Sequence, residues 1–385
     1  MLFRSILAAV LAIFVYGMIA AMLGTILPGL SERFHLTPKQ NGSIAFAQAL
    51  GLMIASLGVG PLIDNEGKKL GLVLGLVLIA VALLSLPRAG GFGSIAALLF
   101  LLGLGGGVVV TGANALVSDV SPDHQSSALN LVNLFFGLGG MVTPFVAANL
   151  LKGNIVKLCY TAGILAVIVL AVQAAAPIPP PTGVQSFVLA DVGSLLGQPI
   201  LLMLGLMLFL YVSCEVGIWN WLVQHLMAEG IPEARALNVL SLGFALGLLV
   251  GRVAVSPVLI TVPPEVVTLA AAVLMAITSY LVLTIRDAKL AWILVFFTGV
   301  AMAPVFPTTL GIVGAWADKS FPAMKSTAMG FAITCGWAGL AVSSRIIGAI
   351  AGGDTKRLRK ALLVIPVFSV VMIALNLALQ AMLRK

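Results

Sequence analysis

Ten residues near the start of the chain carry its most specific signal, and they read Gly60-Pro61-Leu62-Ile63-Asp64-Asn65-Glu66-Gly67-Lys68-Lys69. They separate two long apolar runs, so they predict a turn between two helices. Gly60 allows a neighbouring helix to approach closely. Asp64 can accept hydrogen bonds from the N-terminus of such a helix, where the helix dipole favours an anion. Gly67 permits a tight turn, and we expect Lys68 and Lys69 at the lipid headgroups.

The order of these residues resembles the signature loop of the major facilitator superfamily of membrane transporters. In that family the loop is cytoplasmic and helps to hold one conformation of the transporter. The resemblance therefore implies a conformational latch, whose predicted members are Gly60, Asp64, Gly67, Lys68, Lys69 and Arg252. In the second half of the chain Gly251-Arg252 stands at the comparable place, but the Asp is absent.

The composition independently predicts a membrane protein. Of the 385 residues, 61% are hydrophobic and 9% are charged, and the mean hydropathy is +1.15. A soluble domain is near half apolar and a quarter charged, so lipid must cover part of this surface. The net charge of +8 is spread over loops and helix ends. That spread indicates contact with a membrane surface and excludes a basic domain that binds nucleic acid.

Apolar runs separated by polar breaks predict about twelve membrane-spanning helices, each near the 20 residues that a span requires. The predicted spans are 5–30, 43–63, 70–87, 95–117, 128–150, 157–176, 200–227, 236–260, 265–284, 289–316, 326–351 and 361–383. Pro304 and Pro307 predict a kink in the tenth span. The fold class is therefore an all-α polytopic membrane protein with two pseudo-symmetric six-helix bundles, the major facilitator fold.

A proline-rich break divides the predicted spans into six and six. Residues 177–199 form the predicted central linker, with a short interfacial helix over 187–196, between an N-terminal bundle over 1–176 and a C-terminal bundle over 200–385. A weak internal match supports duplicated halves, because Leu50-Gly51 in the second span resembles Leu242-Gly243 in the eighth. Parallel repeats of this kind are typical of two-halved facilitators.

The charge distribution and the signature loop disagree about orientation. With both termini in the cytoplasm, eight Lys and Arg residues fall on the cytoplasmic side and twelve on the other, and Arg345 lies inside a span. The positive-inside rule therefore opposes this orientation. The basic cluster at 356–360 causes most of the difference. The loop over 60–69 is the reason for placing both termini in the cytoplasm.

Several short stretches resemble the fucose–proton symporter family within this superfamily. The seventh span contains Glu215 followed by Val216-Gly217-Ile218-Trp219, and the tenth span contains Phe306-Pro307-Thr308. Further resemblances lie in Thr111 with Ala113-Asn114, in Asn130 with Gly137 and Gly139-Gly140, and in Gly251-Arg252. The resemblance implies a cavity lined by these helices and a sugar as the substrate.

Two departures weaken the mechanism that this resemblance implies. Symporters of the fucose type carry an Asp in the first span and a Glu in the fourth for proton coupling. This chain has Gly24 or Thr25 and Val110 at the matching places. Those proton sites therefore do not transfer, and coupling is absent, moved to another residue or of another kind.

Charged residues inside spans are costly and usually functional. Glu215, near the middle of the seventh span, is the best candidate for binding and releasing protons, with a structural Glu as the alternative. Arg345 in the eleventh span could pair with Glu215, bind an anionic substrate or extend its charge to the membrane surface. Arg252 lies nearer the end of the eighth span, which favours a structural or gating role.

Polar and aromatic side chains in other spans are further candidates for substrate binding. Asn220 and Gln224 share a face of the seventh span at i and i+4, with an interfacial belt as the alternative. Amides bind hydroxyl groups and aromatic rings stack on sugar rings, so such a set suits a carbohydrate. Interhelical hydrogen bonds explain amides inside spans equally well. The remaining candidates are Asn114, Asn133, Gln48, Tyr16 and Trp337.

The first function hypothesis is a secondary active transporter of a small polar organic solute, a sugar or sugar derivative, that works by alternating access with protons as the candidate coupling ion. The alternative within transport is an exporter of drugs or amphipathic metabolites. A membrane-embedded enzyme is a remote alternative. It would need a catalytic set at membrane depth, whereas His35, His124 and His225 lie near span ends and no metalloprotease motif occurs.

Other expectations follow from the same features. Cys159, Cys214 and Cys335 lie far apart in apolar segments, so we expect small packing residues rather than a redox or metal site. We expect no cofactor, no metal and no nucleic-acid partner. The expected partners are a small-molecule substrate, protons and the lipid bilayer. The expected protein is a monomer integral to a plasma membrane, with a bacterial inner membrane as the favoured location.

Overall fold

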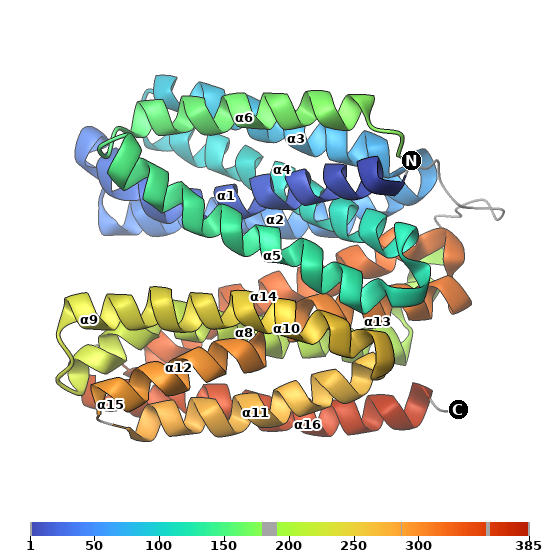
Figure 1. Cartoon of the computed structure of the whole chain (residues 1–385). Coiled ribbons are helices and arrows are strands. Elements are labelled where there is room, and N and C mark those ends of the chain that lie inside the picture. Colours follow the sequence, from blue (N-terminus) through green and yellow to red (C-terminus); the bar gives the residue numbers. More distant parts are fainter. Residues whose placement is uncertain (1, 179–190, 286, 352–354, 384–385) are drawn as a thin grey trace. The chain divides into compact units, whose positions relative to one another are not determined.

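The computed structural model describes residues 2–178, 191–285, 287–351 and 355–383, and all regular elements among them are helices (Figure 1). In the first half they are α1 (Leu2–Phe34), α2 (Pro38–Glu66), α3 (Lys68–Ser85), α4 (Phe92–Val120), α5 (Gln125–Phe145) and α6 (Ile155–Ala175). The second part contains α7 (Val192–Leu196), α8 (Pro199–Ala228), α9 (Glu233–Asn238), η5 (Val239–Ala245), α10 (Leu246–Thr261), α11 (Pro264–Thr284), α12 (Ala288–Met302), α13 (Val305–Ser320), α14 (Lys325–Ala351), α15 (Thr355–Leu362) and α16 (Val364–Leu383). The all-α prediction is confirmed.

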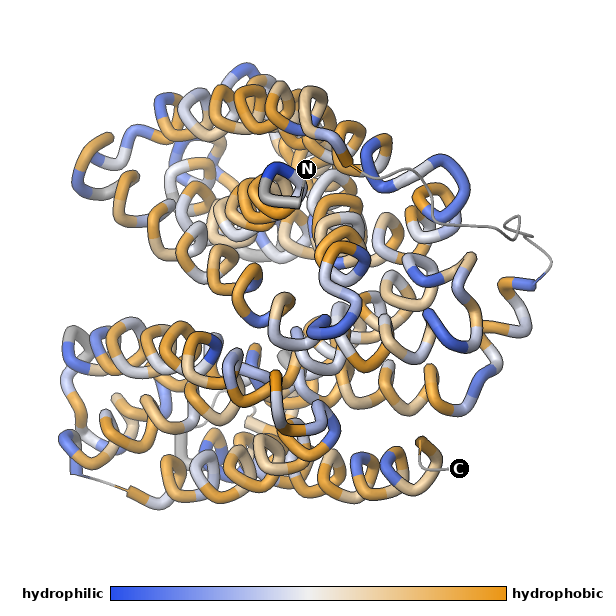
Figure 2. The backbone as a smooth tube through the Cα atoms, turned by 45° about the vertical axis from the view of Figure 1, so that its right-hand side comes forward, coloured by the Kyte–Doolittle hydropathy of each residue, from blue (hydrophilic) through white to orange (hydrophobic). Residues whose placement is uncertain are grey.

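Twelve helical segments in the described residues are long and apolar enough to cross a membrane. Figure 2 shows hydrophobic residues along these helices and hydrophilic residues mainly at the turns between them. Every predicted span has a counterpart, and the tenth is broken between α12 and α13, where Pro304 predicted a kink. The twelve-span prediction is confirmed by length and composition.

The helix ends follow local sequence signals. Thr37 starts α2 with a capping box, because its hydroxyl accepts from the Gln40 backbone N–H at 3.3 Å and the Gln40 side chain accepts from the Thr37 N–H at 2.9 Å. Asn154 caps α6 in the same sense, accepting from the backbone of Lys157 at 2.9 Å. Gly67 separates α2 from α3 with φ of 96°, a conformation that favours glycine. The predicted tight turn at Gly67 is confirmed.

The predicted linker is described only in part. The sixth span ends with α6 at Ala175, as the proline run predicts. Residues 179–190 lie outside the described part of the chain. Of the short helix predicted over 187–196, the described residues show α7 (Val192–Leu196).

Pairs of glycines set the closest helix crossings in each half. A Cβ on Gly51 of α2 would collide with the Phe100 carbonyl, and one on Gly103 of α4 with the Gln48 carbonyl. The crossing of η5 and α10 with α12 is built the same way, because Gly247 lies against the Phe296 carbonyl and Gly299 against the Phe244 carbonyl. Both pairs are separated by 52 residues, which supports a duplicated architecture.

The register of the repeat differs from the one predicted. The sequence match placed Gly51 opposite Gly243, whereas the crossing geometry makes Gly247 its counterpart, one helical turn later. The atoms nearest to a Cβ on Gly243 would be side-chain atoms of Trp292 and Val295, at 3.3 Å or more, so no backbone approaches as closely there. Glycines recur at helical spacing along both spans, so the sequence alone offered several registers one turn apart.

The chain forms two compact units, and each includes a segment from the opposite half of the sequence. The first unit comprises Met1–Asp123, Val132–Leu196 and Gly314–Thr334. The second unit comprises His124–Leu131, Gly197–Val313 and Cys335–Lys385. The exchanged segments are the end of α13 with the start of α14, and the start of α5. The division into bundles over 1–176 and 200–385 stays a prediction.

Candidate functional site

Asp64 lies near the end of α2 and caps the N-terminus of α14, within the first unit. One carboxylate oxygen accepts from the backbone N–H of Ser326 at 2.9 Å. The other accepts from the backbone N–H of Thr327 at 2.8 Å and from its hydroxyl at 2.7 Å. These backbone donors have no partner inside their own helix, and the helix dipole favours the anion. Asp64 therefore makes the kind of contact that the sequence predicted, while its role as a latch stays a prediction.

Two glycines allow α2 and α14 to meet at this point. A Cβ on Gly60, one turn before Asp64, would collide with the backbone of Thr327. A Cβ on Gly330 of α14 would collide with the Ser56 carbonyl of α2. The helices therefore touch backbone to backbone, and Asp64 is held within reach of the α14 N-terminus.

A buried network of charges lies beside this cap. Lys68 at the start of α3 pairs with Asp119 at the end of α4, with 2.6 Å between Nζ and Oδ2. Lys325 at the start of α14 lies 3.3 Å from the other Asp119 oxygen and 2.7 Å from Asp318 at the end of α13. The side chains of Lys68, Lys325 and Asp119 are 10% exposed or less. Two lysines and two carboxylates thus join four helix ends within the first unit.

The sequence reading missed most members of this network. A signal was available, because Ser121-Pro122-Asp123-His124-Gln125-Ser126-Ser127 shares its proline and its closing pair of hydroxyl residues with Phe321-Pro322-Ala323-Met324-Lys325-Ser326-Thr327. In both stretches a short 3-10 turn at the proline leads into a long helix. The match marks equivalent helix starts, and the second of them is the one that Asp64 caps.

Lys69 makes a contact that the sequence did not predict. Its ammonium donates to the carbonyl of Ala176, at the end of α6, with a distance of 3.2 Å. A cation at the C-terminal end of a helix satisfies an otherwise unpaired carbonyl and is favoured by the helix dipole. Lys69 therefore contacts the end of α6, and its expected place at the lipid headgroups stays a prediction.

Replacing Lys68 by Met should lower the stability of the protein more than replacing Lys69 by Met. Removing one partner of a buried pair costs roughly 3–5 kcal/mol, and the loss at Lys68 should be smaller because Asp119 retains Lys325. Lys69 is exposed and makes one hydrogen bond to a carbonyl. Thermal unfolding of both variants in one detergent measures the difference. Equal apparent melting temperatures would show that the Lys68–Asp119 pair contributes nothing.

The equivalent contacts in the second unit contain no acid. The Ser127 hydroxyl of α5 donates to the Ser256 carbonyl of α10 at 2.7 Å. The Asn130 amide donates to the Thr308 hydroxyl at 2.9 Å. A Cβ on Gly311 of α13 would collide with Ser126. The second unit thus repeats the close contact with neutral groups.

Glu215 lies on α8 in a stripe with Tyr211 and Trp219, at spacings of four residues. The carboxylate interacts with both of these side chains and with the charge of Arg252 from α10. Trp219 also contacts Phe244 of η5, with ring centroids 5.3 Å apart in an edge-to-face arrangement. Arg252 is 4% exposed, and Glu215 is partly exposed.

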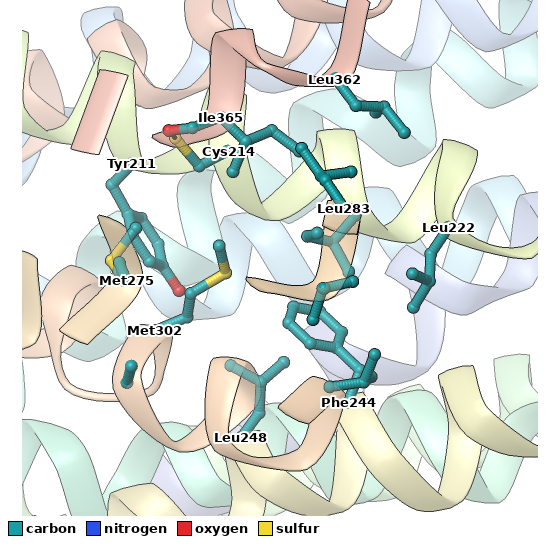
Figure 3. Packing of buried hydrophobic residues seen from close by; sticks show 14 of the residues in the cluster. Tyr211, Cys214, Leu222, Phe244, Leu248, Met275, Leu283, Met302, Leu362 and Ile365 are labelled. Atoms are coloured by element: carbon teal, nitrogen blue, oxygen red, sulfur yellow. Dashed lines mark hydrogen bonds between the residues drawn. The ribbon is translucent and has the colours of Figure 1, made fainter. Parts of the chain in front are cut away.

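Tyr211 forms the inner end of this stripe. The side chain is fully buried, and Figure 3 shows it among Met275, Met302 and Cys214, with its hydroxyl end directed toward Met302. The hydroxyl makes no hydrogen bond of ordinary geometry with a described residue, although it lies close enough to Glu215 to act on it electrostatically. Tyr211 was not predicted from the sequence. Its position four residues before Glu215 was the available signal.

Arg252 lies in a different compact unit from the other predicted latch residues, and its predicted place in the latch stays a prediction. Arg252 belongs to the second unit and interacts electrostatically with Glu215, whereas the cap at Asp64 and the Lys68–Asp119 pair belong to the first. The partner that the sequence offered for Glu215 was Arg345, which lies on α14. The side chain of Arg345 lies outside the described residues, so its predicted pairing stays a prediction.

Two amide candidates of the first unit, Asn114 and Asn133, are hydrogen-bonded within the protein. The Asn133 amide of α5 donates to the Asn114 side-chain oxygen of α4 at 2.8 Å. The Asn114 amide donates to the Val110 carbonyl at 2.7 Å. Asn114 is fully buried and Asn133 is 4% exposed. This geometry favours the interhelical hydrogen bond that the sequence left open as the alternative to substrate binding.

The other candidates lie in different settings. Gln48 is 5% exposed and donates to the Ile19 carbonyl at 3.4 Å, while its side-chain oxygen has no partner among the described residues. Tyr16 is buried and stacks on Phe136 at 5.2 Å between centroids. The other three candidates lie on helices of the second unit. The side chains of Asn220 and Gln224 are exposed, and that of Trp337 is half-buried. In the part of the chain that the structure describes, no group of three or more His, Cys, Asp or Glu side chains could hold a metal ion.

Comparison with known proteins gives a family match over most of the chain. The profile of the Major Facilitator Superfamily matches residues 9–344. Among solved structures, the fucose:proton symporter FucP of E. coli superposes with a TM-score of 0.82 at 17% identity, covering 97% of this chain and 98% of that one. At this identity the likeness shows the fold.

Three curated relatives carry different printed functions. The 4-hydroxybenzoate transporter PcaK of Pseudomonas aeruginosa is 32% identical over 150 residues, which cover 38% of this chain and 33% of PcaK. The glucose/galactose transporter of Brucella abortus is 28% identical over 262 residues, 63% of each chain. The quinolone resistance protein NorA of Staphylococcus aureus is 32% identical over 127 residues, 32% of this chain and 33% of NorA. The matches thus span between about a third and two thirds of the length of these relatives.

Proposed function

Since the chain belongs to the major facilitator superfamily, we propose that it is a secondary active transporter that couples protons to the movement of a small polar organic solute, a sugar or a sugar derivative. Alternating access exposes a central site to one side of the membrane at a time. We place both termini in the cytoplasm of a bacterial cell and expect a monomer in the inner membrane.

The observation that carries the proposal is Glu215 inside a membrane-spanning helix. An ionisable side chain at this depth is costly and is kept where it works. Glu215 interacts with Arg252 and Tyr211, and it is partly exposed, so a proton can reach it. The acids of the fucose-type site are absent at the matching places, which are Gly24 or Thr25 and Val110. Glu215 therefore takes the proton-binding role in this proposal.

The latch residues support alternating access. Asp64 and the Lys68–Asp119–Lys325 network hold the starts of α3 and α14 and the ends of α2 and α4 in one arrangement. These contacts are polar and few. The binding energy of the solute, of the order of a few kcal/mol, can therefore break them. In this proposal the latch closes one side of the transporter and opens during each cycle.

Relatives with different substrates define the test of the solute class. The glucose/galactose transporter favours a sugar, while NorA makes export of drugs the second candidate. A ligand that binds the folded state raises the melting temperature, by a stabilisation of about 2.7 kcal/mol at a hundred times its Kd. Purified protein is therefore screened by thermal shift against sugars, sugar acids and quinolones. Stabilisation by sugars or sugar acids is expected, and stabilisation by quinolones alone would overturn the proposal.

A further inference from the structure

We propose that the short helix α15 binds the headgroup of an anionic phospholipid, and that Arg359 and Lys360 contact its phosphate. The site lies where the chain enters its last span, and it involves neither Glu215 nor the latch residues. The inference is therefore independent of the transported solute and of the coupling ion.

Helix α15 has an apolar face and a basic face. Its buried residues are Leu358, Ala361 and Leu362, which recur at spacings of three and four along the helix. All three belong to the hydrophobic core of the second unit, and Figure 3 shows Leu362 in this core together with Leu222 of α8. Lys360 is exposed and Arg359 is half-buried. Packing on the core thus holds the helix in place and leaves cations at its surface.

The basic face lies at the edge of the lipid-facing surface. The Leu363 N–H donates to the Lys360 carbonyl and the Val367 N–H donates to the Leu363 carbonyl, both at 3.2 Å, so the chain passes from α15 into α16 along a helical path. Lys360, Leu363 and Val367 therefore follow one another on one side at spacings of three and four. Leu363 and Val367 are exposed although they are apolar, as expected of the last candidate span, Arg357–Leu383. A lysine at this edge lies at the level of the lipid headgroups.

The charge at this end of the second unit is positive. The turns that follow α8, α11 and α14 share one side of the membrane because consecutive spans alternate in direction, and Figure 1 shows α9 and α15 at the same end of the unit. These turns, 229–238, 285–289 and 352–363, contain seven basic and four acidic residues, and four of the basic residues lie within 356–360. Among the described side chains, neither Arg359 nor Lys360 forms an ion pair with a carboxylate. A phosphate diester supplies a negative charge that complements them.

A phospholipid suits this surface better than a soluble anion does. Exposed cations attract a soluble ion only weakly, because salt screens the interaction. A lipid also places its acyl chains against the apolar side chains of Leu363 and Val367, and each basic residue near an anionic membrane surface strengthens binding about fivefold. The Arg359 guanidinium can donate two hydrogen bonds to one phosphate, and Lys360 adds a point charge. A zwitterionic headgroup carries its own cation, so we expect the site to favour phosphatidylglycerol over phosphatidylcholine.

The test measures which lipid lies beside α15 in the full-length protein. Leu363→Cys is labelled with bimane in a Cys335→Ser background and reconstituted in phosphatidylcholine vesicles that contain a small fraction of spin-labelled phosphatidylglycerol or spin-labelled phosphatidylcholine. The dependence of quenching on mole fraction gives the ratio of the two association constants. We expect phosphatidylglycerol to be favoured at least fivefold, and Arg359→Gln/Lys360→Gln to bring the ratio close to one.

The matched control is Lys152→Gln/Lys157→Gln, which removes two exposed cations at the turn between α5 and α6 of the first unit and should leave the ratio unchanged. Arg359→Lys/Lys360→Arg guards against misfolding, because it keeps both charges and should keep more than half of the original ratio. Loss of the preference in this charge-preserving variant overturns the inference.

Three further results would also overturn the inference. The first is equal quenching by the two lipids in the labelled protein without further substitution. The second is a preference for phosphatidylglycerol that survives Arg359→Gln/Lys360→Gln at more than half its original size. The third is displacement of spin-labelled phosphatidylglycerol by excess inorganic phosphate, which would assign the site to a soluble anion. Each of these results leaves the proposed transport function intact.

Discussion

Glu215→Gln is expected to abolish accumulation of solute driven by a proton gradient while leaving exchange of solute across the membrane. Glutamine keeps the shape of the side chain and its contacts with Tyr211 and Trp219, but it cannot bind or release a proton. The variant is therefore fixed in a state that resembles protonated Glu215. Gradient-driven uptake should fall to the level of empty liposomes, and counterflow exchange should remain within a fewfold of the wild type.

The matched control is Glu229→Gln, which removes a carboxylate just beyond the end of the same helix. This variant should retain gradient-driven uptake. If Glu215→Gln still accumulates solute in response to the gradient, the proton-binding role of Glu215 is wrong. Loss of exchange together with accumulation would indicate instead that Glu215 is structural.

Asp64→Ala is expected to release the start of α14 and reduce transport at least tenfold. The substitution removes three hydrogen bonds to a charged acceptor, each worth roughly 1.5–3 kcal/mol. A change of about 1.4 kcal/mol alters an equilibrium about tenfold, so the latched arrangement should lose most of its population. Transport should fall because the cycle no longer passes through a well-defined closed state.

Labelling of a cysteine at residue 328 distinguishes release of α14 from general unfolding. Ala328 is fully buried, one residue beyond Thr327, so Ala328→Cys should react with a maleimide only when the contact opens. Cys335 is replaced by Ser in this background because it is partly accessible. Asn65→Ala is the control, since exposed Asn65 bonds only its neighbour Glu66 in the described structure. Labelling that is equally slow with and without the Asp64→Ala substitution would contradict the latch.

Local and compositional features were predictable from the sequence. The number of spans follows from apolar runs near the length of a bilayer crossing, and helix ends follow from groups such as Thr37 and Gly67. The break at Pro304 is also local, because a proline inside a helix lacks the N–H that the helix needs and favours a break or kink there, although α2 continues through Pro61. These features depend on residues that are close together in the chain.

Contacts between distant segments were not predictable in the same way. Lys325 pairs with Asp119, which is more than two hundred positions earlier, and Arg252 interacts electrostatically with Glu215 from a different helix. The sequence predicted that Asp64 accepts hydrogen bonds from the N-terminus of a neighbouring helix. That this helix is α14 could be seen only in the folded structure. The amides Asn114 and Asn133 looked like substrate groups because the sequence cannot show that Asn133 donates to Asn114 and that Asn114 donates to a backbone carbonyl.

Proton-driven accumulation by the purified wild-type protein tests the central proposal most directly. Proteoliposomes with an alkaline interior are given a solute that stabilises the protein in the thermal-shift screen. Accumulation above the external concentration, and its collapse when a protonophore is added, is the predicted result. Equilibration without accumulation, unchanged by the protonophore, would contradict proton-coupled transport.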